Sequence, residues 1–178
     1  MKRFLLAVAP LAVVSPAYAT TYLTVEQAQA AIFPGAAMTP DPRTLTPDQA
    51  KAIAKAAGVK PLSPALKAWK VAAADGKSAG WFIVDEVVGK HEFITFAVGI
   101  DAAGAVRGIE ILDYREVYGG EVRAPAWRAQ FTGKTAASAM VLDHDIRNIS
   151  GATLSSRHVT DGVKRLLVTA QLVLAPKG

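Results

Sequence analysis

The pattern of apolar and polar positions in the middle of the chain predicts a group of β-strands. Four segments there are rich in β-branched and aromatic residues, namely 69–73, 81–88, 93–100 and 106–112. The links between them are short and contain turn-forming residues such as Asp75-Gly76, which favours antiparallel neighbours over helical crossovers. We therefore expect an antiparallel sheet of about four to six strands, with the strand order left open.

Two short helices are predicted before this strand-rich region. Thr24 can cap the first one, because Gln27 follows it three residues later in the pattern of a capping box. Thr46 can cap the second, with Pro47 in the first helical position, where a proline costs no hydrogen bond. The proline-rich segment between the helices, residues 35–43, is typical of a loop.

The strongest helical pattern lies at the end of the chain, at about residues 155–173. Its apolar residues recur at helical spacing and form one face: Val159, Val163, Leu166, Leu167, Ala170 and Val173. A shorter helix is expected at residues 125–131. Together these elements predict an α+β fold in which N-terminal helices and a long C-terminal helix pack on an antiparallel sheet.

The first 19 residues have the pattern of a cleaved signal peptide. Lys2 and Arg3 precede an apolar run at residues 4–14, and Ala17-Tyr18-Ala19 supplies small residues at a cleavage site. The run is broken by Pro10 and is shorter than the roughly 20 residues that cross a bilayer. We expect cleavage after Ala19, export, and no transmembrane segment in the mature chain.

Composition narrows the class of protein further. Cleavage would leave 159 of the 178 residues, which divide by pattern into a helical segment, 20–64, and a strand-rich domain, 65–178. The chain has no cysteine, which excludes disulfides, cysteine-ligated clusters and thiolate metal sites. Of the net charge of +5, Lys2 and Arg3 contribute two, so the mature chain carries +3, too little to indicate nucleic-acid binding.

The segment before the last helix carries the candidate chemistry. Four hydroxyl residues and a glycine gather at the expected start of this helix: Ser150, Gly151, Thr153, Ser155 and Ser156. A helix N-terminus presents unpaired N–H groups and the positive end of its dipole, so it suits a phosphate, to which Arg157 can add a charge. The residues alone leave a second interpretation open, in which the hydroxyls only cap the helix.

Ser150-Gly151-Ala152-Thr153, followed by Ser155, resembles the flavinylation motif of the FMN-binding domain family. This family includes flavin-carrying components of the sodium-translocating NADH:quinone reductase and of Rnf-type complexes, as well as free-standing exported domains. The resemblance implies that Thr153 carries FMN through a phosphoester bond. A separate flavin transferase forms this bond with FMN taken from FAD, in the presence of magnesium.

Three further segments occur in the order in which the family shows them, and the similarity covers roughly residues 79–172. The first is the turn at 101–104 between two strands. The second is the loop at 114–120, which resembles the loop that lines the flavin. The third, at 127–134, resembles a segment that ends in Gly-Lys. The resemblance implies flavin contacts for the following residues: Glu116, Tyr118, Gly119 and Lys134.

The resemblance also implies a role and a compartment. Residues 65–178 would form an FMN-binding domain that carries electrons between a membrane redox system and another acceptor, without enzyme activity of its own. The signal peptide and the family together predict a periplasmic location. The sequence lacks both a retained membrane helix and the ETPG form of the glutamate loop found in the large pumps, which favours a free-standing carrier.

A departure from the family motif keeps rival interpretations open. The motif usually has an acid three residues before its serine, where this chain has Arg147, although Asp143 or Asp145 can substitute from a shifted loop. The alternative is therefore a binding module that holds flavin or another phosphate ligand noncovalently. A reductase with its own substrate is the weakest interpretation, because the chain has no G-x-G-x-x-G pattern. The three histidines lack the spacing of a metal site.

Overall fold

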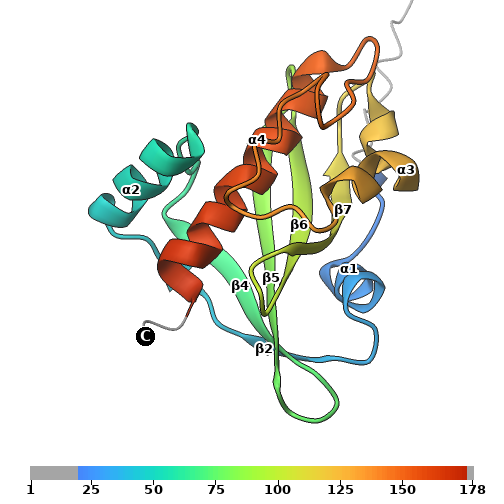
Figure 1. The fold of residues 1–178 in the computed structure, drawn as a ribbon. Helices are drawn as coiled ribbons and strands as arrows, with labels where there is room; N and C mark the ends of the chain where they lie inside the picture. The colour runs from blue at the N-terminus through green and yellow to red at the C-terminus, as the bar shows by residue number, and fades with distance from the viewer. Residues whose placement is uncertain (1–19, 176–178) are drawn as a thin grey trace, which may run out of the picture.

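A seven-stranded antiparallel sheet forms the centre of the computed structural model, which describes residues 20–175 (Figure 1). The strand order is β1-β7-β6-β5-β4-β2, and β3 pairs with β4 beside this path. Helices lie on both sides of the sheet, so the fold is the expected α+β arrangement. The predicted signal peptide, residues 1–19, lies outside the described residues.

The four predicted strands are confirmed as consecutive antiparallel neighbours. They are β4 (Ala65–Ala72), β5 (Ser78–Val88), β6 (Phe93–Asp101) and β7 (Val106–Tyr114). Short links leave no room for a crossover, so each strand returns beside the one before it. One end of this meander therefore gathers the β5–β6 turn and the loop that follows β7.

Three short strands were not expected from the sequence. They are β1 (Thr20–Thr21), which pairs with β7, and β2 (Ala37–Pro40) and β3 (Arg43–Thr44), which both pair with β4. The prediction of a loop at residues 35–43 was therefore wrong in part. Its prolines are tolerated because β2 is the last strand of the sheet order, where a residue without an N–H interrupts no central ladder.

Both N-terminal helices are confirmed, with their predicted capping boxes. In α1 (Val25–Ile32), Gln27 N–H donates to Thr24 Oγ1 at 3.2 Å, and Thr24 N–H donates to Gln27 Oε1 at 2.8 Å. Thr46 and Gln49 make the same pair of bonds at the start of α2 (Pro47–Ala57). These reciprocal bonds satisfy two donors that a helix start otherwise leaves unpaired.

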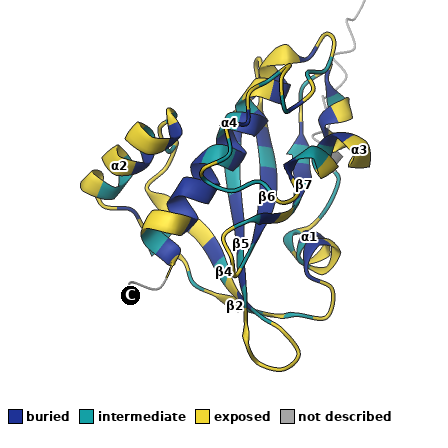
Figure 2. Cartoon of the chain, viewed as in Figure 1, coloured by how far each residue is buried: buried dark blue, intermediate teal, exposed yellow. Residues whose placement is uncertain are grey.

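The long C-terminal helix α4 (Thr153–Thr169) crosses one face of the sheet and ends in a π-helical turn, η3 (Ala170–Leu174) (Figure 1). Its apolar face is buried, as Figure 2 shows, and packs on a core that includes Ile83, Phe96 and Val98. The helix begins two residues earlier than expected, so Thr153 is its first residue.

Alternation along β5 gives the sheet a second buried face, because Phe82 and Val84 point away from α4. Helix α1 covers that face with Ala28 and Ile32, together with its C-cap residue Phe33. The sheet is thus buried between α4 on one side and α1 on the other.

The chain between β7 and α4 is mostly irregular but well packed. It includes η1 (Gly120–Arg123), α3 (Pro125–Arg128) and η2 (Ala129–Phe131), which confirm the short helix expected near residue 125. Trp127 and Phe131 are buried edge to face, with ring centroids 5.1 Å apart. Within residues 20–175, no helix is both long enough and apolar enough to cross a membrane.

Candidate functional site

A pocket of about 500 Å³ lies at the N-terminal end of α4. Three segments that are distant in the sequence meet there, namely the β5–β6 turn, the loop after β7 and the first turn of α4. They contribute these lining residues: Lys90, His91, Glu116, Val117, Tyr118, Gly151, Ala152, Thr153, Leu154 and Ser155. The volume lies in the range of about 300–1,000 Å³ that is typical of small-molecule sites.

The start of α4 is not closed by its hydroxyl side chains. Its N-cap residue is Ala152, and no side chain caps the helix in the described part of the chain. Thr153 is exposed, whereas Ser155 and Ser156 are buried with other partners. The N–H groups of the first turn have no carbonyl partner within the helix, so they remain available to an anion. The structure therefore does not support the capping interpretation.

Ser156 and Ser155 are oriented away from the helix N–H groups. Ser156 Oγ donates to the Ala152 carbonyl at 3.2 Å. Ser155 Oγ lies 3.1 Å from the hydroxyl of Tyr114, whose proton is donated to the carbonyl of Tyr118. Because a phenol has one proton, Ser155 is the donor in its contact with Tyr114. Burial raises the pKa of Tyr114, which keeps this hydroxyl protonated.

Gly119 lets the loop after β7 approach the motif closely. It has a φ of +92°, and a Cβ at this position would lie 2.6 Å from the Tyr114 hydroxyl and in collision with Ala152. Only a residue without a side chain fits such a backbone so near another chain segment. Gly119 is therefore buried beneath the motif, while the neighbouring Tyr118 is 77% exposed at the pocket.

Glu116 holds this loop against the β5–β6 turn. Its Oε1 accepts N–H bonds from His91 at 2.5 Å and from Glu92 at 3.0 Å. Burial raises the pKa of Glu116, but the backbone N–H groups of the turn outweigh that effect and leave the pKa lowered. The carboxylate is thus a charged anchor at neutral pH and positions Lys90 and His91 in the pocket wall.

The mouth of the pocket exposes large apolar side chains. Val117 is 86% exposed, Tyr118 77% and Leu154 43%. Exposed apolar side chains that gather at a pocket are typical of a binding surface. The site therefore combines an anion-binding helix end with an apolar rim.

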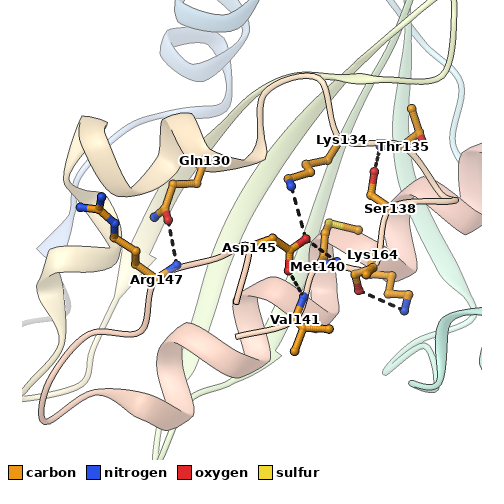
Figure 3. A network of polar contacts seen from close by, with 10 residues as sticks. Gln130, Lys134, Thr135, Ser138, Met140, Val141, Asp145, Arg147 and Lys164 are labelled. Carbon is orange, nitrogen blue, oxygen red and sulfur yellow. Dashed lines mark hydrogen bonds and ion pairs between the residues drawn. The ribbon is translucent and has the colours of Figure 1, made fainter. Parts of the chain in front are cut away.

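Lys134 does not line the pocket. It supports the loop before the motif (Figure 3). Its Nζ lies 3.3 Å from Asp145 Oδ2, and the same carboxylate accepts N–H bonds from Met140 and Val141. Burial raises the pKa of Asp145, but the bond from the Val141 N–H and the charge of Lys134 together have the larger effect. The pKa of Asp145 is therefore held below its ordinary value. Asp145 is therefore fully engaged within this loop.

Arg147 is fixed through its backbone and not through its side chain. Its N–H donates to Gln130 Oε1 at 2.8 Å, and its carbonyl accepts from Trp127 Nε1 at 2.8 Å. The guanidinium is exposed and points away from Asp145 (Figure 3). The neighbouring Asn148, which the sequence did not single out, directs its amide to Thr153 Oγ1 at 3.2 Å.

The model of the FMN-binding domain family matches residues 89–168, which include all the residues that line this pocket. Residues 89–168 belong to the FMN-binding domain family. No curated protein matches the chain.

The fold of the FMN-binding domain is also found in a solved structure, that of NqrC from Shewanella oneidensis. The two chains superpose with a TM-score of 0.53 and 21% sequence identity. The match covers 70% of this chain and 63% of the NqrC chain, so it spans less than two thirds of that protein. It establishes a shared fold.

The residues of the FMN-binding domain fit FMN at this pocket. The uncapped start of α4 suits the phosphate, and the exposed apolar rim suits a flat ring system. Arg157 is exposed on the first turns of α4 but does not line the pocket. No group of three or more histidine, aspartate or glutamate side chains that could hold a metal occurs among the described residues.

A second pocket of similar size lies at the opposite end of the FMN-binding domain. It has a volume of about 510 Å³ and includes the turn at residues 101–104 and the end of α4 near Ala170. None of the motif residues lines it. The pocket at Thr153 is therefore the one to which the sequence motif and the helix N-terminus both belong.

Proposed function

We propose that FMN is attached by its phosphate to Thr153 and that the protein is an exported electron carrier. The observation that carries this proposal is the position of Thr153. It is exposed, it is the first residue of an uncapped helix, and it lies in a pocket large enough for a small molecule. Its hydroxyl is thus accessible to a modifying enzyme, and a phosphate on it would lie beside free N–H groups.

Each part of the pocket has a separate task in this proposal. The first-turn N–H groups and the dipole of α4 stabilise the phosphate charge. Val117 and Tyr118 offer an apolar surface to the ring, while Gly119 and Glu116 fix the loop that carries them. The bound isoalloxazine supplies the redox chemistry, and the protein supplies its position and exposure to partners.

The maturation and the redox partners follow from the same proposal. A flavin transferase would modify Thr153, and a membrane redox system would exchange electrons with the flavin exposed at the mouth of the pocket. The signal-peptide pattern supports export to the periplasm, where a covalent bond prevents loss of the cofactor. A carrier of this kind needs no catalytic residues of its own.

A noncovalent binding module is the second candidate, and Arg147 is the observation that favours it. This residue stands where the motif usually has an acid, and Asp145 is engaged by Lys134 and two backbone N–H groups. In that case the same pocket would hold FMN or another phosphate ligand without an ester bond.

Intact-mass measurement of the denatured mature protein separates the two functions. The protein should be made in its native host or with a flavin transferase, and compared with Thr153→Ala and, as a matched hydroxyl control outside the pocket, with Thr44→Ala. We expect the mass of FMN less water on the unaltered protein and on Thr44→Ala, mapped to the Thr153 peptide, and none on Thr153→Ala. Flavin that leaves on denaturation would establish the noncovalent module.

A further inference from the structure

The side-chain amide of Asn148 is held in one orientation beside Thr153. Its Oδ1 accepts the N–H of Ile149 at 2.8 Å, so its Nδ2 must face the other way. Nδ2 lies 3.2 Å from Thr153 Oγ1 and 3.5 Å from Asp143 Oδ2. A flipped amide would place two donors against each other at Ile149, which excludes that orientation.

We propose that Asn148 is a positioning residue for flavin transfer to Thr153, an inference that rests on the covalent function proposed above. Its N–H bond to Oγ1 fixes the direction of the hydroxyl and leaves a second lone pair of the oxygen for attack. The contact therefore acts by holding the oxygen in the orientation for attack, and not by stabilising charge on it.

The transfer step that Asn148 assists involves no change of oxidation state. Thr153 Oγ1 forms a bond to the flavin-bearing phosphorus of FAD, and the bond from that phosphorus to the bridging oxygen of the pyrophosphate breaks. AMP is the leaving group. The hydroxyl proton passes to a base of the transferase or to water, because a neutral amide is too weak a base to take it and Asn148 contacts Oγ1 only as a donor.

The surroundings explain why this task falls to Asn148 and not to the acids upstream. Asp145 is engaged by Lys134, Met140 and Val141, so it is not free to contact Thr153. Asp143, in a left-handed conformation with a φ of +65°, reaches the amide of Asn148 at the limit of hydrogen-bond distance. It supports the amide, which in turn contacts the threonine.

The test is the rate of flavin transfer in a purified system. Unmodified full-length mature protein is mixed with a flavin transferase, FAD and Mg²⁺, and covalent FMN is followed over time by mass spectrometry. For Asn148→Ala we expect the rate at saturating acceptor to fall about tenfold or more, with KM for the acceptor within about twofold, because one contact to the reacting oxygen is lost. The rate for Asp143→Asn should fall by less.

His144→Ala is the matched control, since it truncates an exposed side chain of the same loop and should leave the rate within about twofold. Thermal unfolding of each unmodified variant checks the fold. If Asn148→Ala is unstable, Asn148→Ser takes its place, because a serine hydroxyl can still accept from Ile149 N–H but is too short to reach Thr153.

The outcomes separate the inference from the function on which it rests. A reduced rate of flavin transfer to Asn148→Ala, with unchanged KM and unfolding temperature, supports the positioning role. Modification of Asn148→Ala or Asn148→Ser at the unaltered rate overturns that role and leaves the covalent function standing. If the unaltered protein itself gains no covalent FMN, the proposed function fails, and the role of Asn148 fails with it.

Discussion

The carboxylate of Glu116 is the charged residue that most directly shapes the pocket, because it joins two of the three segments that line it. Its pKa is raised by burial but lowered more by the N–H groups of Glu92, His91 and Lys90, so it lies below the ordinary value of 4.5. A group with a lower pKa in the folded state stabilises the fold above its unfolded pKa. That contribution is lost as the pH falls through the folded pKa.

The lowered pKa of Glu116 predicts that acid releases the loop after β7. Between about pH 7 and pH 3, the amide NMR signals of His91 and Glu92 should shift together, with a midpoint below 4.5, as Glu116 is protonated. In Glu116→Gln, whose amide oxygen can still accept the two bonds, the shared transition should be absent. An equal transition in that variant would assign the titration to another group.

The sequence named several residues of the site through local spacing, but not the contacts that these residues make with remote partners. Thr153 was predicted because its motif is contiguous and stands before a helical pattern. Glu116 was named as a flavin contact, but the bonds from its carboxylate to backbone N–H groups 24 and 25 residues earlier in the chain were not predicted. The ion pair of Lys134 with Asp145, and the position of Asn148, which the sequence did not single out, depend on how an irregular loop folds back, and no periodic pattern describes such a loop.

At the scale of elements, the close packing of α4 on the sheet depends on Gly162. A Cβ at this position would lie 2.7 Å from Phe96 Cζ and 2.8 Å from Val87 Cγ1, both in the buried core. Alanine normally favours a helix over glycine by about 1 kcal/mol. Overpacking of a filled core costs about 1–3 kcal/mol, which is the larger effect here.

Gly162→Ala should therefore destabilise the protein by about 1 kcal/mol, against the usual helix preference. Urea unfolding should show a lower midpoint with an unchanged slope. Val87→Ala is the matched partner, because it removes one of the colliding atoms. The double variant should be more stable than the sum of the two single effects predicts. Additive effects, or a higher midpoint for Gly162→Ala, would contradict close packing at this position.

Elements with strong local sequence signals were predicted correctly, whereas the short strands at the sheet edges were not. The capping residues Thr24 and Thr46 were predicted because their partners lie three residues away. The strands β2 and β3 were missed, because their prolines indicate a loop and their pairing comes entirely from β4. The start of α4 was displaced by two residues, since Ala152 offers no capping signal.

At the scale of the whole molecule, the N-terminal segment completes a core that the family match alone does not contain. The match begins at residue 89, after β5, yet β1 pairs with β7 and α1 covers the face of the sheet opposite α4. The contact is close, since a Cβ on Gly99 of β6 would lie 2.6 Å from Phe33. Helix α2 also packs on Val168 of α4.

Removal of residues 20–64 should therefore abolish cooperative folding of the remaining domain, 65–178, although all four long strands and α4 are retained. The truncation uncovers Phe82, Val84, Ala97 and Leu112, and an exposed apolar face of this kind favours association over a fixed fold. Near-ultraviolet circular dichroism during thermal unfolding measures the loss of cooperative folding, and binding of a hydrophobic dye measures the exposed apolar face.

Ile32→Ala in the full mature chain is the graded control. It should lower the free energy of unfolding by about 2–4 kcal/mol and keep a single transition. A truncated protein that unfolds cooperatively near the temperature of the full chain would show that residues 65–178 fold alone, and that the N-terminal helices serve another purpose.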